Sequence, residues 1–127
     1  MIEIIFYVAD QRMSKQFYQF VLNAKPILDV PGMTEFLLSK DCKLGLMPET
    51  GIAKILGDKV PHPSTGNGIP RYELYLYTTG TADYYQRLVI AGAKEISLSK
   101  KGLGEIVPVI SVIETAYVIA VAEKISP

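Results

Sequence analysis

Apolar and polar residues follow the same order twice along the chain. Residues 2–8 and 72–78 alternate β-branched, aromatic and polar side chains, a pattern typical of strands. An amphipathic stretch of helical period follows each of them. Further strand patterns then occur at residues 26–30, 34–39 and 43–47 in the first half and at 95–99, 105–112 and 116–123 in the second. Each half therefore predicts the order strand, helix, strand, strand, strand.

The two predicted helices carry apolar stripes and recognisable ends. The stripes are formed by Met13, Phe17, Phe20 and Val21 in the first copy and by Tyr84, Leu88 and Ala91 in the second. Asp10 or Gln11 is expected to open the first helix and Thr81 the second. Asn23 and Gly92 are expected to supply the left-handed residue that ends each helix.

The two copies align with an almost constant offset. Glu3 aligns with Glu73 at an offset of seventy, whereas Asn23 aligns with Gly92 at sixty-nine, so one residue is missing within the second helix. A chain of 127 residues is long enough for one well-buried domain. We therefore expect a single domain with module 1 at about residues 1–47, a proline- and glycine-rich linker at about 48–70 containing one helical turn at 52–56, and module 2 at about 71–127.

Strand alternation predicts which side chains face away from the helices. If Ile4, Phe6 and Val8 pack on the first helix, Glu3 and Tyr7 point to the opposite face of the sheet. The second copy likewise turns Glu73, Tyr75 and Tyr77 away from its helix. Two curved sheets related by pseudo-symmetry would then line a common cleft with acids and tyrosines, which suits a small organic ligand. The alternative is that the tyrosines fill a core or cover a dimer interface and that the glutamates are solvated.

Charge and cysteine content exclude several classes of function. The formal net charge is zero, and no basic stripe with interleaved aromatic residues is present, so no nucleic-acid partner is expected. The most apolar stretch, residues 106–122, is interrupted by Pro108 and Glu114, and no membrane partner is expected. Cys42 is the only cysteine, and the N-terminal residues lack a secretory pattern, so a cytoplasmic location is expected.

The motifs together resemble a known superfamily. The runs "YVADQRMSKQFYQFVLNAKPI", "PGMTEFLLSKDCKLGLMP" and "ELYLYTTGTADYYQRLVIAGAKEI" are similar to those of the glyoxalase, bleomycin-resistance and dioxygenase superfamily, also called vicinal oxygen chelate proteins. The resemblance covers nearly the whole chain. It implies an α+β fold of two βαβββ modules whose curved mixed sheets surround a cleft, and it is specific for the fold rather than for one activity.

The resemblance also implies four positions for a divalent metal. They fall on Glu3, near Gly45, on Glu73 and on Ala120, and neither Gly45 nor Ala120 has a ligating side chain. Two carboxylates without an imidazole form a poor site for zinc, nickel or iron. Magnesium tolerates one or two carboxylates with waters, but nothing in the sequence selects it. We therefore expect no metal and no cofactor.

Two principal functions remain open. The first is a protein similar to bleomycin-resistance proteins that binds a small organic ligand in a metal-free cleft, with Tyr7, Tyr75, Tyr77, Met47 and Ala120 as ligand-binding residues. The second is a lyase or isomerase of the same superfamily that uses Glu3 and Glu73 as catalytic acid and base, or as ligands of a weak divalent metal site. A partner-binding domain that kept the fold and lost the chemistry is a weaker third hypothesis.

The remaining expectations concern assembly and two isolated side chains. A homodimer is expected, because the sheets have edges and apolar faces that need cover and because proteins of this superfamily commonly pair their modules. His62 lies between prolines in the linker, where an exposed side chain is the commoner case, and no base or helix N-terminus near Cys42 is evident to activate its thiol.

Overall fold

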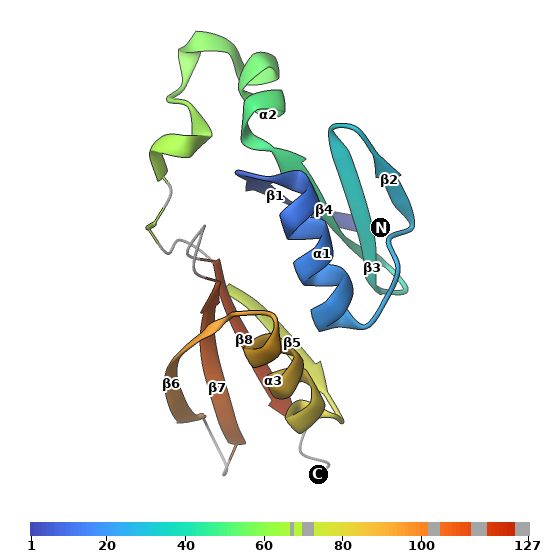
Figure 1. Cartoon of the computed structure of the whole chain (residues 1–127), viewed down its shortest axis with the longest axis vertical. Coiled ribbons are helices and arrows are strands. Elements are labelled where there is room, and N and C mark those ends of the chain that lie inside the picture. The colour runs from blue at the N-terminus through green and yellow to red at the C-terminus, as the bar shows by residue number, and fades with distance from the viewer. Residues whose placement is uncertain (67, 70–72, 102–104, 113–116, 124–127) are drawn as a thin grey trace. The chain divides into compact units, whose positions relative to one another are not determined.

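A computed structural model describes residues 1–66, 68–69, 73–101, 105–112 and 117–123 of the chain. The chain divides into two compact units, Met1–Asn67 and Gly68–Pro127. Each unit contains a four-stranded mixed sheet with a helix on one face (Figure 1). This arrangement confirms the predicted α+β class and the two βαβββ modules.

In the first unit the elements follow the predicted order. They are β1 (Ile2–Val8), α1 (Gln11–Leu22), β2 (Leu28–Val30), β3 (Met33–Ser39) and β4 (Cys42–Pro48). The strand order in the sheet is β1-β4-β3-β2, with β1 parallel to β4 and the remaining pairs antiparallel. The first and last strands of the module are therefore neighbours, which places residues from both ends of the module side by side.

The second unit repeats this topology. Its elements are β5 (Glu73–Thr78), α3 (Thr81–Ile90), β6 (Lys94–Lys101), β7 (Glu105–Val112) and β8 (Tyr117–Glu123), and the sheet order is β5-β8-β7-β6. Strand β5 is parallel to β8. Residues 72 and 116, which were expected to begin two of these strands, lie outside the described residues.

The helix ends follow from local chemistry. Asp10 is the N-cap of α1, and its carboxylate accepts a hydrogen bond of 2.9 Å from the backbone N–H of Met13. Asn23 ends α1 in the left-handed conformation at φ 51°, and Gly92 has φ 93° just after α3. Helix α3 is shorter than α1, ten residues against twelve. The predicted left-handed residues Asn23 and Gly92 are therefore confirmed, whereas the N-cap of α3 is Gly80 and Thr81 is its first helical residue.

The cores lie between each helix and its sheet. In the first unit the fully or nearly buried side chains include Phe6, Val8, Tyr18, Val21, Phe36, Leu44 and Leu46, and in the second Leu74, Leu88, Ile119 and Val121. Three residues that were expected in the packed stripe or strand are exposed: Ile4 at 42%, Met13 at 50% and Phe20 at 42%. Helix α1 packs on β4 and β3 rather than on the edge strand β1, so only Phe6 and Val8 of β1 are buried beneath it. The buried side of α1 carries Tyr18 and Val21.

A second short helix follows β4. Helix α2 (Glu49–Leu56) begins earlier than the single turn expected at residues 52–56, and Ile52 is buried. The helix contacts β4 and β1, so its apolar side adds to the first unit. Two 3-10 turns, Gly57–Lys59 and Pro63–Gly66, continue the segment. None of the helices in the described part of the chain is both long and apolar enough to cross a bilayer.

Candidate functional site

The candidate site begins with the face of the first sheet that is turned away from α1. In the parallel register of β1 and β4, Glu3 pairs with Lys43, Ile5 with Gly45, and Tyr7 with Met47. Because alternate residues of a strand share a face, these six residues lie on one side of the sheet. Phe6 and Leu46, which are paired on the other side, are buried under the helix.

Strand β3 adds a second carboxylate to this face. Glu35 pairs with Gly45 in the antiparallel register of β3 and β4. The Lys43 ammonium nitrogen lies 3.2 Å from Glu3 Oε2 and 3.1 Å from Glu35 Oε2. The Lys43, Glu3 and Glu35 side chains are 25%, 21% and 12% exposed, so water screens the three charges only partly. We call these three residues the Glu3–Lys43–Glu35 cluster.

The two carboxyl groups of the cluster differ in their affinity for a proton. A hydrogen bond with Glu35 is the main cause that raises the pKa of Glu3 above its ordinary value of 4.5, and burial raises it further. The same hydrogen bond lowers the pKa of Glu35. Contact with Glu35 first, and with Glu3 second, raises the pKa of Lys43, which keeps the ammonium charged. The arrangement thus places two carboxyl groups with opposite pKa shifts around one cation.

Gly45 makes room for the Glu3 carboxyl group. A Cβ atom at position 45 would lie 3.3 Å from Glu3 Oε1 and 3.2 Å from Ile5 Cγ1, which is tighter than ordinary contact. The Glu3 side chain therefore leans across the backbone of β4 at the one strand position that has no side chain. The space that a side chain of residue 45 would need is already taken by Glu3.

These residues do not fit the metal site that the resemblance implies. Gly45 offers no donor atom, and the Lys43 ammonium lies against the carboxylate oxygen of Glu3 that a metal would need. Within the described ranges, no three His, Cys, Asp or Glu side chains gather in a way that could hold a metal ion.

The second unit presents the corresponding face with different chemistry. In the register of β5 and β8, Glu73 pairs with Val118, Tyr75 with Ala120, and Tyr77 with Ala122. Tyr75 packs on the buried Ala120 and Ala122, and its ring lies 4.9 Å from that of Tyr77, centroid to centroid. Tyr77 is 65% exposed. This face is thus aromatic and apolar where the first carries the ionic cluster.

Register explains why the two faces differ. Gly45 of the first unit corresponds to Ala120 of the second, and Lys43 corresponds to Val118. The partner of Ala120 on β7 is Val109, which stands where Glu35 stands beside Gly45. The repeat therefore kept a glutamate on the first strand of each unit but placed the lysine and the second glutamate only in the first.

Seven residues that the sequence predicts for the site lie on these faces, and two residues of the cluster were missed. Glu3, Tyr7 and Met47 share the face of the first sheet, and Glu73, Tyr75, Tyr77 and Ala120 share that of the second. Glu35 and Lys43 were missed, although strand alternation over residues 34–39 and 43–47 would place them on one side of the sheet. What the sequence lacked was the register that brings both to Glu3.

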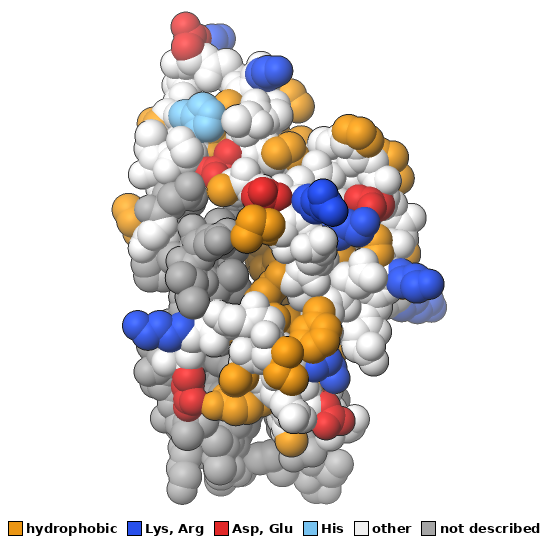
Figure 2. All heavy atoms as spheres, viewed as in Figure 1, with side chains coloured by type: hydrophobic (Ala, Val, Ile, Leu, Met, Phe, Trp, Pro, Cys, Tyr) orange, Lys and Arg blue, Asp and Glu red, His pale blue; other side chains and the backbone are white. Residues whose placement is uncertain are grey.

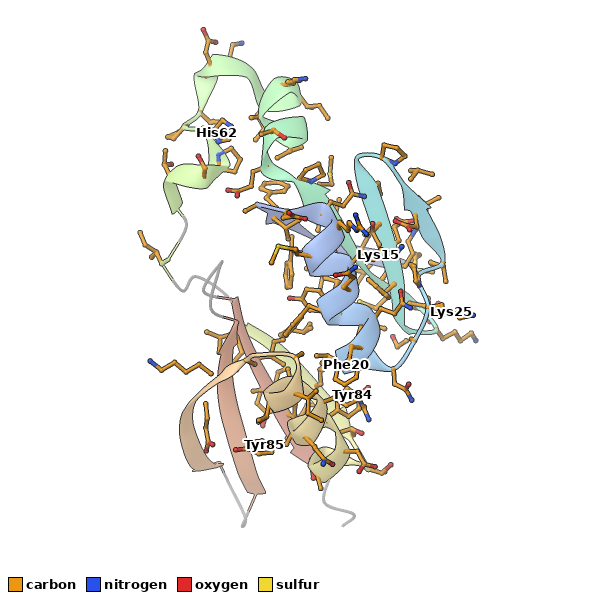
Figure 3. All side chains as sticks on the ribbon, viewed as in Figure 1. Lys15, Phe20, Lys25, His62, Tyr84 and Tyr85 are labelled. Atoms are coloured by element: carbon orange, nitrogen blue, oxygen red, sulfur yellow. The ribbon has the colours of Figure 1, made fainter. Side chains whose placement is uncertain are left out.

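His62 and Cys42 lie apart from the cluster. His62 follows α2 in the segment before the second 3-10 turn (Figure 3). Its Nδ1 accepts a hydrogen bond of 3.1 Å from the backbone N–H of Ser64, which stabilises that turn. Cys42 is a half-buried free thiol at the start of β4.

A separate hollow lies between α1 and the β2–β3 hairpin. It has a volume of about 370 Å³ and is lined by Gln11, Arg12, Lys15, Asp29, Val30, Pro31 and Thr34. Lys15 reaches from α1 towards the hairpin and forms an ion pair with Asp29 (Figure 3). Asp29 Oδ1 also accepts a hydrogen bond of 3.0 Å from the buried Thr34 hydroxyl. These bonds join α1 to the hairpin across the hollow.

The fold matches a number of solved structures at low sequence identity. No protein-family model and no curated protein sequence matches the chain. A glyoxalase-related enzyme from Fulvimarina pelagi superposes with a TM-score of 0.78 at 16% identity, covering 98% of this chain and 87% of that one. The fold is that of the glyoxalase, bleomycin-resistance and dioxygenase proteins. The resemblance inferred from the sequence is therefore confirmed for the fold.

Two further structures illustrate the range of this similarity. A glyoxalase/bleomycin resistance protein/dioxygenase family enzyme from Burkholderia phytofirmans PsJN has a TM-score of 0.75 at 11% identity, with 97% of both chains covered. A lactoylglutathione lyase from Agrobacterium tumefaciens has a TM-score of 0.69 at 17% identity, with 97% of this chain and 92% of that chain covered. At such identities the likeness concerns the fold alone.

Proposed function

We propose that this glyoxalase-like protein binds a small organic ligand against the sheet face that carries Glu3, Tyr7 and Met47, without a divalent metal. The single observation that carries the proposal is the Lys43 ammonium, which lies within 3.2 Å of two carboxylate oxygens on that face. The cation satisfies the charge that a metal would otherwise have to balance. A site of this kind recognises its ligand through hydrogen bonds and apolar contact.

The surroundings of the cluster support an organic ligand. Ile5 and Tyr7 are 39% and 37% exposed beside the partly buried Met47, so aliphatic and aromatic surface lies next to charged groups. Ligand sites commonly combine an apolar lining with a few polar groups that fix orientation. The Tyr75–Tyr77 pair gives the second unit a face suited to stacking with a flat ligand.

Binding of 8-anilinonaphthalene-1-sulfonate, an aromatic anion, tests this proposal. The protein contains no tryptophan, so the emission of the bound dye is easily separated from that of the protein. We expect saturable binding that falls at least tenfold in Tyr7→Ser. The control is Phe20→Ser, which removes an exposed aromatic side chain from α1 on the other side of the sheet. Absence of saturable binding, or equal losses in both variants, would contradict the proposal.

The proposal that the site works without a divalent metal is tested by a separate measurement. Elemental analysis of the purified protein is expected to find no divalent metal in stoichiometric amount, and chelation with EDTA is expected to leave the melting temperature unchanged. A stoichiometric transition metal that chelation removes with a loss of stability would overturn this part, whatever the outcome of the dye experiment.

A second candidate function is proton transfer by a lyase or isomerase. The observation that favours it is the hydrogen bond between Glu3 and Glu35, which gives the two carboxyl groups opposite pKa shifts. Glu35 would then supply the partner carboxylate for which the sequence pointed to Glu73. The test is deuterium uptake next to the carbonyl of hydroxyketones in D₂O, followed by ¹H NMR. Uptake at the uncatalysed rate, or equal uptake by Glu3→Gln, would exclude this function for these substrates.

A further inference from the structure

Lys43 differs from an ordinary surface lysine in its surroundings. Its ammonium contacts two carboxylates from two different strands, Glu3 on β1 and Glu35 on β3, and its side chain is only 25% exposed. A surface ion pair usually contributes little, since it is screened by water and costs side-chain entropy. Here the lysine is held from both sides, and the three groups lie on adjacent strands of one sheet.

The position of the ammonium is the second observation. The resemblance implies a metal held from the first and last strands of both modules, and in the first unit these strands are the neighbours β1 and β4. Lys43 is directly opposite Glu3 in the register, two residues before Gly45 and on the same face. Its ammonium therefore lies where oxygen ligands converge from β1 and β3.

Gly45 provides neither a metal ligand nor a side chain that would occupy the space beside Glu3. A ligating side chain there would have to begin with a Cβ atom 3.3 Å from Glu3 Oε1. Glycine at 45 and lysine at 43 are thus complementary: the first removes a metal ligand and frees space for the Glu3 carboxyl group, and the second supplies the positive charge.

We propose that the ammonium group of Lys43 is a built-in cation that takes the place of the divalent metal in the first unit. The inference rests on the proposed metal-free function. The cluster then retains two carboxyl groups that can bind a hard divalent cation, and the charge of Lys43 opposes its entry. Removal of the lysine charge should convert the cluster into a weak site for Mn²⁺ or Mg²⁺, which prefer carboxylate and water oxygens.

The experiment is a Mn²⁺ titration at pH 8, followed by the electron paramagnetic resonance signal of the free ion. For Lys43→Met we expect one Mn²⁺ per chain with a dissociation constant on the order of 10⁻⁴ to 10⁻³ M. The wild type and Lys43→Arg, which keep the cation, are expected to bind at least tenfold more weakly. If Lys43→Met does not fold, as judged by circular dichroism, Lys43→Gln replaces it.

Two controls locate the gained site. Lys25→Met removes the charge of an exposed lysine in the same unit and is expected to behave as the wild type. Combining Lys43→Met with Glu35→Gln removes one of the two carboxylates and is expected to abolish the gain.

The outcomes separate this inference from the proposed function. If folded Lys43→Met or Lys43→Gln gains no binding, or if the gain survives Glu35→Gln, the built-in cation is refuted while ligand binding without metal still stands. If the wild type itself binds one Mn²⁺ as tightly as Lys43→Met, both the inference and the metal-free part of the proposed function fail.

Discussion

Glu3 and Glu35 show how a neighbouring strand sets the chemistry of a residue. Their hydrogen bond raises the pKa of one carboxyl group and lowers that of the other, although both are ordinary glutamates in the sequence. A group whose pKa is raised in the folded state stabilises the fold below its unfolded pKa, and this contribution is lost as the pH rises through its folded pKa. A group whose pKa is lowered stabilises the fold above its unfolded pKa, and this contribution is lost as the pH falls through its folded pKa. The two contributions therefore oppose one another in the acid range.

Glu35→Gln should lower the pKa of Glu3. The substituted amide donates a hydrogen bond to the Glu3 carboxylate instead of sharing its proton, and the Lys43 ammonium still favours the ionised form. The measurement is a ¹³C NMR titration of the Glu3 carboxyl carbon. Glu95→Gln in the second unit is the control and should leave the Glu3 titration where it is in the wild type. An unchanged midpoint in Glu35→Gln would show that the carboxyl groups do not interact.

At the scale of single elements, the two helices differ at their first residue. Asp10 caps α1, whereas the N-cap of α3 is Gly80, which has no side chain to accept a hydrogen bond. Asp10→Ala should therefore lower the free energy of unfolding by about 1 kcal/mol, the usual cost of losing an N-cap side chain. Urea denaturation followed by circular dichroism measures this loss. Asp41→Ala, an exposed aspartate that caps no helix, should cost little by comparison.

Gln11 connects α1 to the β2–β3 hairpin. Its amide nitrogen donates 2.9 Å hydrogen bonds to the Val30 carbonyl and to Thr34 Oγ1, and its amide oxygen accepts a 2.9 Å bond from the Gly32 backbone N–H. The junction therefore holds the turn at residues 30–33 against the start of the helix.

Gln11→Ala should destabilise the fold by about 1 to 3 kcal/mol, because it leaves hydrogen-bonding groups at a partly buried junction without their partner. Gln16→Ala is the matched control, since Gln16 is an exposed glutamine of the same helix. Hydrogen exchange of the Gly32 amide reports the same junction and should accelerate only in Gln11→Ala. Equal losses of stability in both variants would show that the hydrogen bonds of Gln11 do not stabilise the junction.

On the scale of the whole molecule, each unit has its own sheet, helix and core. Strands β1 and β5 are terminal in their sheets, and β1 carries Ile2, which is 66% exposed. On the surface shown in Figure 2, acidic and basic side chains are interspersed with apolar ones. The mixed charge is in keeping with the formal net charge of zero.

The homodimer stays a prediction that light scattering can test. Edge strands with apolar side chains commonly find cover in another chain. Size-exclusion chromatography with light scattering should give twice the 14.0 kDa mass of one chain at micromolar concentration. Ile2→Lys places a charge on the edge strand and should shift the mass towards the monomer, whereas Ile55→Lys, on the exposed side of α2, should not. A monomeric wild type would refute the prediction.

The sequence alone determined the repeated order of strands and helix, because hydrophobic period and cap residues such as Asp10, Asn23 and Gly92 act over a few neighbouring residues. It also determined that Glu3 and Tyr7 turn away from α1, because strand alternation is local. The Glu3–Lys43–Glu35 cluster was decided only by the tertiary structure. Its members are far apart in the chain, and the register that joins β1 and β3 to β4 depends on how Phe6, Phe36 and Leu44 pack beneath the helix. That same register set Gly45 under the Glu3 carboxyl group and left its counterpart, Ala120, under a tyrosine.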